Sequence, residues 1–250
     1  MEELKGKVAL ITGAGRGFGR AIGERFAEAG ATLALNYRES ATGCEEVAEQ
    51  VRALGGRAIT VQTDVTDGPA IETMVSRVID ELGRIDILVN NAGIMYHEPF
   101  VESGEEHWRH ELEVNVFGPL RLTHAVARGM IAQGGGRIVN LSSQLALTGW
   151  ERAPVYAGTK GFILTWTKSL ARELGQHNIT VNAIGPGSII TDMNADVYPN
   201  EDAKQRRARE LPLRRFGSPS DVAECALFLA SDAGSFLTGQ MLGPNGGNVM

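Results

Sequence analysis

The chain has 250 residues, a formal net charge of −6 and 43% hydrophobic residues. This length suits one large α/β domain over residues 1–250, and the acidic charge argues against nucleic acid as a partner. No apolar run is long enough to cross a membrane, and no signal-peptide pattern precedes the first apolar run. Cys44 and Cys225 lack the spacing of metal ligands, so we expect reduced thiols in a cytoplasmic protein without a metal site.

Short apolar runs alternate with helical patterns along the chain. The predicted strands are Val8–Thr12, Thr32–Asn36, Ala58–Thr63, Ile85–Asn90, Arg137–Leu141, Thr180–Ile184 and Gln240–Gly243. The predicted helices are Gly17–Ala29, Thr42–Leu54, Ala70–Leu82, Glu105–Ala132, Pro154–Gly175 and Pro219–Ala230. The strands are rich in Val, Ile and Leu with little alternation, which is typical of strands covered on both faces. The pattern predicts an α/β fold of the Rossmann type, a doubly wound parallel sheet of about seven strands with helices on both faces.

The segment Thr191–Phe216 breaks this alternation, because it is polar, charged and long for a connection. In sheets of this kind the ligand binds beyond the C-terminal ends of the strands. We therefore predict a mobile lid over the site at residues 191–216. The alternative is a peripheral pair of helices that takes no part in closure.

The first predicted strand leads into a glycine-rich loop, which is followed by a helix. Glycines let backbone N–H groups approach a pyrophosphate, and a helix N-terminus favours negative charge. The glycine spacing is G-x-x-x-G-x-G, which differs from the G-x-G-x-x-G fingerprint. The loop predicts a nucleotide site, and the alternative is a tight strand-to-helix connection with no ligand. The residues assigned to this site are Gly13, Gly15, Arg16, Gly17, Phe18 and Gly19.

The end of the second predicted strand indicates which dinucleotide is preferred. A site for NAD normally has an acidic residue here, which holds the adenosine ribose, whereas this chain has Asn36, Tyr37 and Arg38. Arg38 and Arg16 can both reach toward that ribose, and two guanidinium groups without a carboxylate suit a 2′-phosphate. We predict a preference for NADP(H). If Arg38 is only a solvated loop residue, NAD(H) is used as well.

Tyr156 and Lys160 lie four residues apart in a predicted helix and therefore share one face. A cation beside a phenol favours the phenolate, and such a tyrosine can pass a proton to or from an alcohol oxygen. Alone, this spacing is common on exposed helices.

Asn115 stands in the middle of a predicted helix among apolar neighbours, so its partly buried amide must find hydrogen-bond partners.

These motifs follow the order found in short-chain dehydrogenase/reductases, and the chain resembles that family over almost its full length. Asp64-Val65 resembles the adenine-binding pair of the family, and Asn90 to Gly93 resembles its N-N-A-G motif. Ser143 ends the fifth predicted strand and matches the catalytic serine. The resemblance implies that the catalytic residues are Asn115, Ser143, Tyr156 and Lys160. The cofactor residues that it adds are Asp64, Val65, Asn91, Ala92, Gly93, Tyr156, Lys160, Pro186, Gly187, Ile189 and Thr191.

The resemblance also implies a mechanism, in which hydride passes between NADP(H) and a carbonyl carbon. Tyr156 exchanges a proton with the substrate oxygen, and Ser143 donates a hydrogen bond to it. Lys160 is expected to lower the pKa of Tyr156 and to hold the nicotinamide ribose. Asn115 is expected to anchor water that connects Lys160 to solvent.

The substrate is the part that the residues leave open. Pocket candidates near the strand ends and the lid are Met95, Tyr96, His97, Gln144, Leu145, Trp150, Ile189 and Met193. The overall pattern is similar to that of 3-oxoacyl-(acyl-carrier-protein) reductases, which implies that Arg128 and Arg172 dock the acidic carrier protein near the mouth of the site. The alternatives are a small ketone, sugar or cyclic alcohol as substrate, or a protein that senses nucleotide without catalysis. A homotetramer is expected by the same resemblance.

Overall fold

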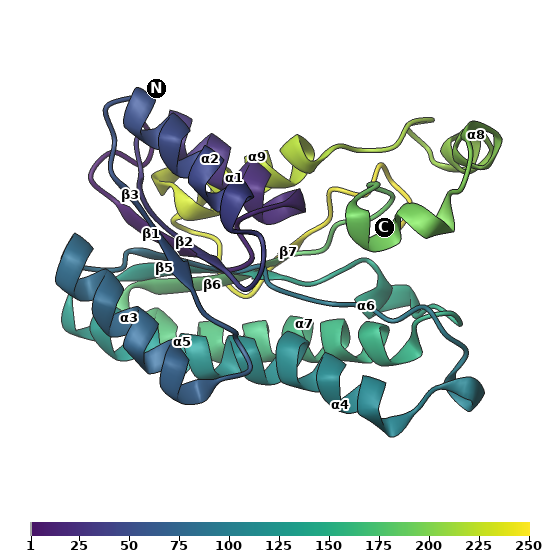
Figure 1. Ribbon diagram of the computed structural model, residues 1–250, viewed down its shortest axis with the longest axis horizontal. Helices are drawn as coiled ribbons and strands as arrows, with labels where there is room; N and C mark the ends of the chain where they lie inside the picture. The colour runs from purple at the N-terminus through teal and green to yellow at the C-terminus, as the bar shows by residue number, and fades with distance from the viewer. Residues whose placement is uncertain (1) are drawn as a thin grey trace.

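The computed structural model describes residues 2–250, without the side chains of residues 194–196. Within this range seven parallel strands form one sheet in the order β3-β2-β1-β4-β5-β6-β7 (Figure 1). The strands are β1 (Val8–Ile11), β2 (Thr32–Tyr37), β3 (Ala58–Gln62), β4 (Ile87–Asn90), β5 (Gly136–Leu141), β6 (Ile179–Ile184) and β7 (Met241–Leu242). The predicted doubly wound parallel sheet is confirmed, and the strand bounds differ from the predicted ones by no more than two residues.

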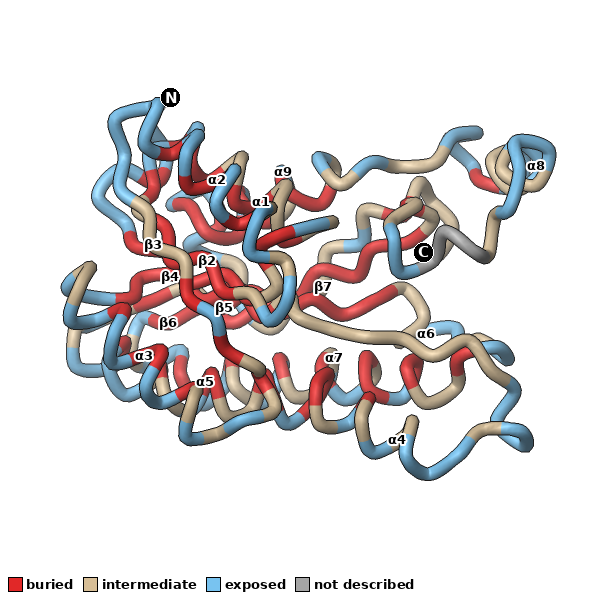
Figure 2. The backbone as a smooth tube through the Cα atoms, viewed as in Figure 1, coloured by how far each residue is buried: buried red, intermediate tan, exposed pale blue. Residues whose placement is uncertain are grey.

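Helices cover both faces of the sheet (Figure 1). One layer contains α1 (Gly17–Glu28), α2 (Ala41–Ala53) and α9 (Pro219–Ala230). The other contains α3 (Gly68–Leu82), α5 (Gly118–Ala132) and α7 (Pro154–Leu174). A separate apolar cluster fills each interface, with Phe26 and Val47 in the first and Ile71 and Leu122 in the second. Figure 2 shows that the strands are largely buried between these layers. No helix in the described part of the chain combines the length and the apolar character that a membrane span needs.

The helix predicted over Glu105–Ala132 is interrupted. It consists of α4 (Glu105–Leu112), a π-helical turn at Glu113–Phe117, and α5. Pro119 has no N–H to offer to the carbonyl four residues earlier, that of Asn115, so the α-helical ladder cannot continue there. The N–H of Gly118 donates instead to the carbonyl of Glu113, five residues back. The sequence analysis missed this turn because the apolar pattern on either side of it is helical.

The segment predicted as a lid contains a 3₁₀ turn at Asp192–Val197 and a polar helix, α8 (Glu201–Glu210). Asn200 caps α8 by accepting the N–H of Ala203 at 2.9 Å. The helix has no buried residue and stands away from the sheet near the C-terminus (Figure 1). Its helical structure agrees with the alternative of peripheral helices, whereas the short helix α6 (Leu145–Thr148) was not predicted. The role of residues 191–216 in closure stays a prediction.

A buried polar network joins the centre of the sheet to the layer of α5 and α7. Asn90, at the end of β4, donates to Asn140 Oδ1 on β5 at 2.8 Å and to Thr123 Oγ1 on α5 at 3.0 Å. Asn140 donates in turn to Thr167 Oγ1 on α7 at 2.9 Å. Unpaired, each of these buried groups would cost free energy, so the network favours one position of α7 along the sheet.

Candidate active site

A cleft of about 280 Å³ lies at the carboxyl ends of β1, β2, β4 and β5. It spans the junction of β1 and β4, where successive crossovers run in opposite directions and ligands usually bind in such sheets. Its predicted lining residues are Gly13, Gly15, Arg16, Gly17, Phe18, Asn36, Tyr37, Arg38, Asp64, Val65, Asn91, Ala92, Gly93, Tyr156, Lys160, Thr191 and Met193. The residues assigned from the sequence that lie outside the lining include Gly19, Asn115, Ser143, Pro186, Gly187 and Ile189.

The glycine loop takes a backbone path that other residues rarely follow. Gly13 and Gly17 have φ angles of +62° and +54°. A Cβ on Gly19 would overlap the carbonyl of Gly13, so Gly19 shapes the loop from behind instead of lining the cleft. Because α1 starts at Gly17 without an acidic residue in its first turn, its free N–H groups suit a phosphate.

Thr12 connects this loop to the end of β4. Its hydroxyl group accepts the N–H of Asn91 and the N–H of Ala92, each at 3.0 Å, and donates to the carbonyl of Val89. The side-chain amide of Asn91 returns two bonds, to the carbonyls of Thr12 at 2.7 Å and Gly13 at 3.1 Å. These bonds hold the two halves of the cleft together. The predicted N-N-A-G residues therefore have a structural task as well as a place in the cleft.

The side-chain amide of Asn36 forms hydrogen bonds within the sheet. Its side chain is buried, and its amide donates to the carbonyls of Val61 at 3.3 Å and Thr63 at 3.0 Å, which join β2 to the end of β3. Asn36 borders the cleft, but its donor group is turned into the sheet. Asn36 therefore lies at the predicted place beside the cleft, and its part in cofactor binding stays a prediction.

Arginines and carboxylates alternate at this end of the cleft. Arg38 is 47% exposed and forms an ion pair with Glu39 at 2.7 Å and a longer one with Asp64 at 3.9 Å. Arg16 lies 3.8 Å from Asp192. Glu39 also lines the cleft, and it could not be predicted because it stands beyond the position where an acidic residue normally occurs. Exposed ion pairs contribute little, so a phosphate can displace these partners at small cost.

Tyr156 and Lys160 meet at the other end of the cleft, near the N-terminus of α7. Lys160 is 5% exposed, and its Nζ donates to the carbonyl of Leu141 at 2.7 Å. The same ammonium group lies 5.5 Å from the centroid of the Tyr156 ring. Ser142, at the end of β5, donates to the carbonyl of Lys160 at 2.9 Å, which ties the helix to the strand.

The ionisation of this pair differs from the prediction. Burial raises the pKa of Tyr156 to about 12, against a smaller lowering by its hydrogen bond with Ser143. Burial also lowers the pKa of Lys160 to about 8. The predicted lowering of the pKa of Tyr156 is wrong for this arrangement, because burial of the phenol has the largest effect and raises it. The buried charge of Glu111 raises the pKa of both residues.

The side chain of Asn115 forms hydrogen bonds with other groups of the protein. Its Oδ1 accepts the N–H of Ile94 at 2.9 Å, and its Nδ2 donates to the carbonyl of Ile94 at 2.8 Å and to Thr159 Oγ1 at 3.2 Å. The expectation that its amide finds partners is confirmed, but these partners are the segment after β4 and helix α7. The expected role as a water anchor therefore stays a prediction. A Cβ on Gly93 would lie 3.2 Å from Asn115 Oδ1 and 3.6 Å from Lys160 Nζ, so Gly93 separates the two side chains.

Several pocket candidates gather around the remaining edge of the site. The rings of His97 and Trp150 meet edge to face, 5.4 Å apart, and the guanidinium group of Arg152 lies 5.6 Å from the Trp150 ring. Gln144 accepts a bond from Asn248 at 3.0 Å, so the C-terminal residues support this edge. Ile189 is buried and packs in the apolar core, and its predicted places in the cofactor site and the pocket stay predictions.

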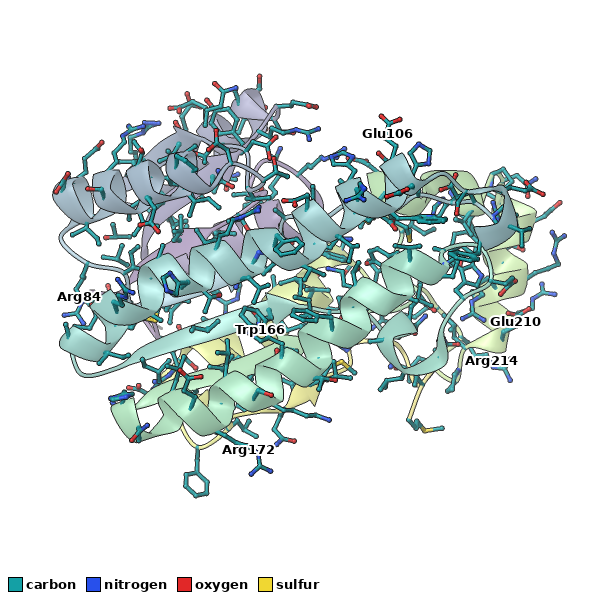
Figure 3. The ribbon with its side chains drawn as sticks, turned by 90° about the horizontal axis from the view of Figure 1, so that it is seen from below. Arg84, Glu106, Trp166, Arg172, Glu210 and Arg214 are labelled. Atoms are coloured by element: carbon teal, nitrogen blue, oxygen red, sulfur yellow. The ribbon has the colours of Figure 1, made fainter. Side chains whose placement is uncertain are left out.

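The two arginines expected to dock a carrier protein are exposed but lie far from the cleft of their own chain. Arg172 is sixteen residues beyond Tyr156 on α7, which places it about 24 Å along the helix axis. It projects outward from the far end of that helix (Figure 3). Arg128 is similarly near the far end of α5. Their predicted position at the mouth of this cleft is therefore wrong within one chain.

A family model described as enoyl-(acyl carrier protein) reductase matches residues 13–248, which include both ends of the cleft. The chain belongs to the short-chain dehydrogenase/reductase family. The sequence is 40% identical to 3-oxoacyl-(acyl-carrier-protein) reductase of Aquifex aeolicus over 246 residues, or 98% of each chain.

Solved members of the family share the fold closely. Gluconate 5-dehydrogenase of Burkholderia cenocepacia, solved with NADP and tartrate, is 32% identical with a TM-score of 0.93, over 98% of this chain and 96% of that one. A 7α-hydroxysteroid dehydrogenase, solved with NADH and 7-oxo glycochenodeoxycholic acid, is 36% identical with a TM-score of 0.93, over 99% of this chain and 96% of that one. Family members of one fold therefore differ in both substrate and dinucleotide.

Replacing Thr12 by Val should separate the two halves of the cleft. The change keeps the shape of the side chain but removes the acceptor for the N–H groups of Asn91 and Ala92, so we expect the unfolding free energy to fall by about 1–3 kcal/mol. Hydrogen exchange at these two amides should accelerate. Thr32→Val, at the partly buried start of β2, serves as the control. Equal exchange at both amides in wild type and Thr12→Val would contradict this account.

Proposed function

We propose that this protein is an NADP(H)-dependent carbonyl reductase and alcohol dehydrogenase, with Tyr156 as the proton-transferring group. The observation that carries the proposal is the arrangement of one cleft. A glycine loop and two arginines form one end, and the buried pair of Tyr156 and Lys160 forms the other. A protein that only senses nucleotide needs the first end but not the second.

The residues at the first end fit a dinucleotide phosphate. The positive φ angles of the loop and the start of α1 present backbone N–H groups to a pyrophosphate. Arg16 and Arg38 are both exposed at the cleft and hold only weak ion pairs, which suits a 2′-phosphate. Glu39 is the competing feature, because a carboxylate favours a ribose with free hydroxyl groups.

The proposed chemistry depends on the protonation of Tyr156 and Lys160 at the second end of the cleft. When bound, the nicotinamide group supplies or accepts a hydride. Tyr156 is protonated at neutral pH, since burial raises its pKa to about 12, so it suits the donation of a proton to a developing alkoxide. Ser143, which bonds to Tyr156, is placed to orient the same oxygen. Lys160, with a pKa lowered to about 8, can return the proton to the site.

We propose 3-oxoacyl thioesters as the leading substrate class, supported by the similarity to 3-oxoacyl-(acyl-carrier-protein) reductase. Sugar acids and cyclic alcohols are the alternatives, supported by the gluconate and hydroxysteroid dehydrogenases of the same fold. A panel of acetoacetyl thioesters, diketones, sugar acids and steroid ketones distinguishes these classes. A comparison of acetoacetyl groups on carrier protein and on coenzyme A shows whether a carrier docks.

Tyr156→Phe should abolish most turnover without preventing cofactor binding. Loss of the hydroxyl group removes the proton donor, which is worth about 10²–10⁴-fold in rate. NADPH binding, followed by nucleotide fluorescence, should persist because the ring remains. Tyr198→Phe is the matched control, since that ring packs on Phe216 in the lid segment. Full activity in Tyr156→Phe would refute the assignment.

Arg38→Ala should reduce the preference for NADPH over NADH. A charged hydrogen bond contributes about 1.5–3 kcal/mol, so kcat/KM for NADPH should fall by roughly 10–100-fold while the value for NADH stays almost constant. Arg57→Ala, an exposed residue before β3, controls for the general loss of positive charge. A wild-type protein that prefers NADH, or an equal loss with both nucleotides, would rule out the 2′-phosphate contact.

A homotetramer is part of the proposal. The outer faces of α5 and α7 carry apolar side chains that the chain itself does not cover, including Phe162, which is 40% exposed and stacks on Trp166 (Figure 3). Phe236, in the segment before β7, is fully exposed. Two such patches suit two subunit contacts. Light scattering should give four times the chain mass of 26.8 kDa, and a monomer would contradict the assembly.

A further inference from the structure

Glu111 is a buried carboxylate beside the candidate catalytic pair, and the mechanism above does not use it. It lies on α4, one helical turn before Asn115, and its exposure is 2%. Buried carboxylates are rare unless they are paired or hydrogen-bonded. Glu111 Oε1 accepts the N–H of Tyr96 at 2.8 Å.

Glu111 and Asn115 together hold the segment that follows β4. Asn115 Oδ1 accepts the N–H of Ile94, and Glu111 accepts the N–H of Tyr96, two residues further along. In an extended segment, N–H groups two residues apart point to the same side, about 6.6 Å apart. Side chains four residues apart on a helix are separated by a similar distance, about 6 Å. The two acceptors therefore form a two-point clamp on one wall of the site.

This wall is built from ring and titratable side chains. Tyr96 stacks on His107 with the ring centroids 4.0 Å apart, and its hydroxyl group is 2.8 Å from His110 Nδ1. The carboxylate of Glu98 is 2.9 Å from His107 Nδ1. These side chains stack on and bond to one another beside Tyr96, so the anchor of Tyr96 on Glu111 also positions them.

The charged and titratable groups around Glu111 come from the wall and from α7. Burial raises the pKa of Glu111 to about 7, which the charge of Glu98 reinforces and the charges of His107 and Lys160 oppose. In return, ionised Glu111 raises the pKa of Tyr156 and of Lys160. Glu111 thus changes its charge near neutral pH, next to the pair that exchanges protons.

We infer that Glu111 is a positioning residue for the proposed reaction: its buried carboxylate anchors the pocket wall at Tyr96 and places a negative charge beside Tyr156 and Lys160. This inference rests on the proposed function. The two roles can be separated, because glutamine keeps an oxygen for the N–H of Tyr96 but has no charge, whereas leucine has neither.

The first test is the pH profile of the reductase. In Glu111→Gln, Tyr156 and Lys160 lose their protons more easily, so the fall of kcat/KM with rising pH should move about one unit toward lower pH. The KM for the substrate should stay near the wild-type value. Glu111→Leu should show the same shift and also a KM raised roughly tenfold, because the wall loses its anchor. Glu106→Gln is the control, as that carboxylate lies on the same helix and points into solvent (Figure 3).

The second test does not need turnover. The pKa of Lys160, followed by NMR of the carbon next to its amine and assigned with Lys160→Met, should fall below about 8 in Glu111→Gln and stay unchanged in Glu106→Gln. If wild type reduces no carbonyl, the proposed function fails while this titration still decides the role of Glu111. Equal Lys160 titrations in Glu111→Gln and wild type would overturn the inference. If Glu111→Leu does not fold, Glu111→Gln alone decides it.

Discussion

The bond set around Thr12 is the constraint on which the rest of the site depends. β1 and β4 are neighbours in space although 75 residues separate the end of β1 from the start of β4 in sequence, and the crossovers leave them in opposite directions. The opposite crossovers open a cleft between the ends of β1 and β4. One half of the cleft follows β1 and the other follows β4, so no single strand joins them. Thr12 and Asn91 close the gap with four short bonds between the loop and the end of β4. These bonds fix the distance between the glycine loop and the end of β4. A ligand that contacts both ends of the cleft requires such a fixed distance.

Burial sets the chemistry at the far end of the cleft, and it acts in opposite directions on an acid and a base. The same loss of solvent keeps the phenol of Tyr156 neutral and makes the amine of Lys160 easier to deprotonate. A third buried group, Glu111, partly offsets the effect on the amine and adds to the effect on the phenol. The position of α7, fixed by Asn140 and Thr167 in the sheet interface, determines how deep this pair lies. The contacts that hold α7 against the sheet therefore also influence the pKa values of Tyr156 and Lys160.

Much of the fold and of the candidate site could be predicted from the sequence, because these features depend on patterns of residues that are close together in the chain. The apolar strands and the glycine loop each depend on neighbouring residues. The features that could not be predicted have non-local causes. The amide of Asn36 bonds to β3, more than twenty residues away, and Ile189 packs into a core shared by distant helices. The raised pKa of Tyr156 reflects burial, which no spacing reveals. Glu111 did have a signal, a carboxylate one helical turn before Asn115, but its partner Tyr96 lies on a separate segment.

The π-helical turn at Glu113–Phe117 has a consequence for how this region can vary. Each residue turns an α-helix by about 100°, so loss of the one extra residue would rotate α4 by that amount relative to α5. Glu111 would then leave the wall that Asn115 still holds. Local repacking can accommodate a replaced side chain. It cannot accommodate a deleted residue, because the whole of α4 then rotates relative to α5. The residue count of this helix is therefore fixed at the turn, whereas surface loops accept insertions and deletions.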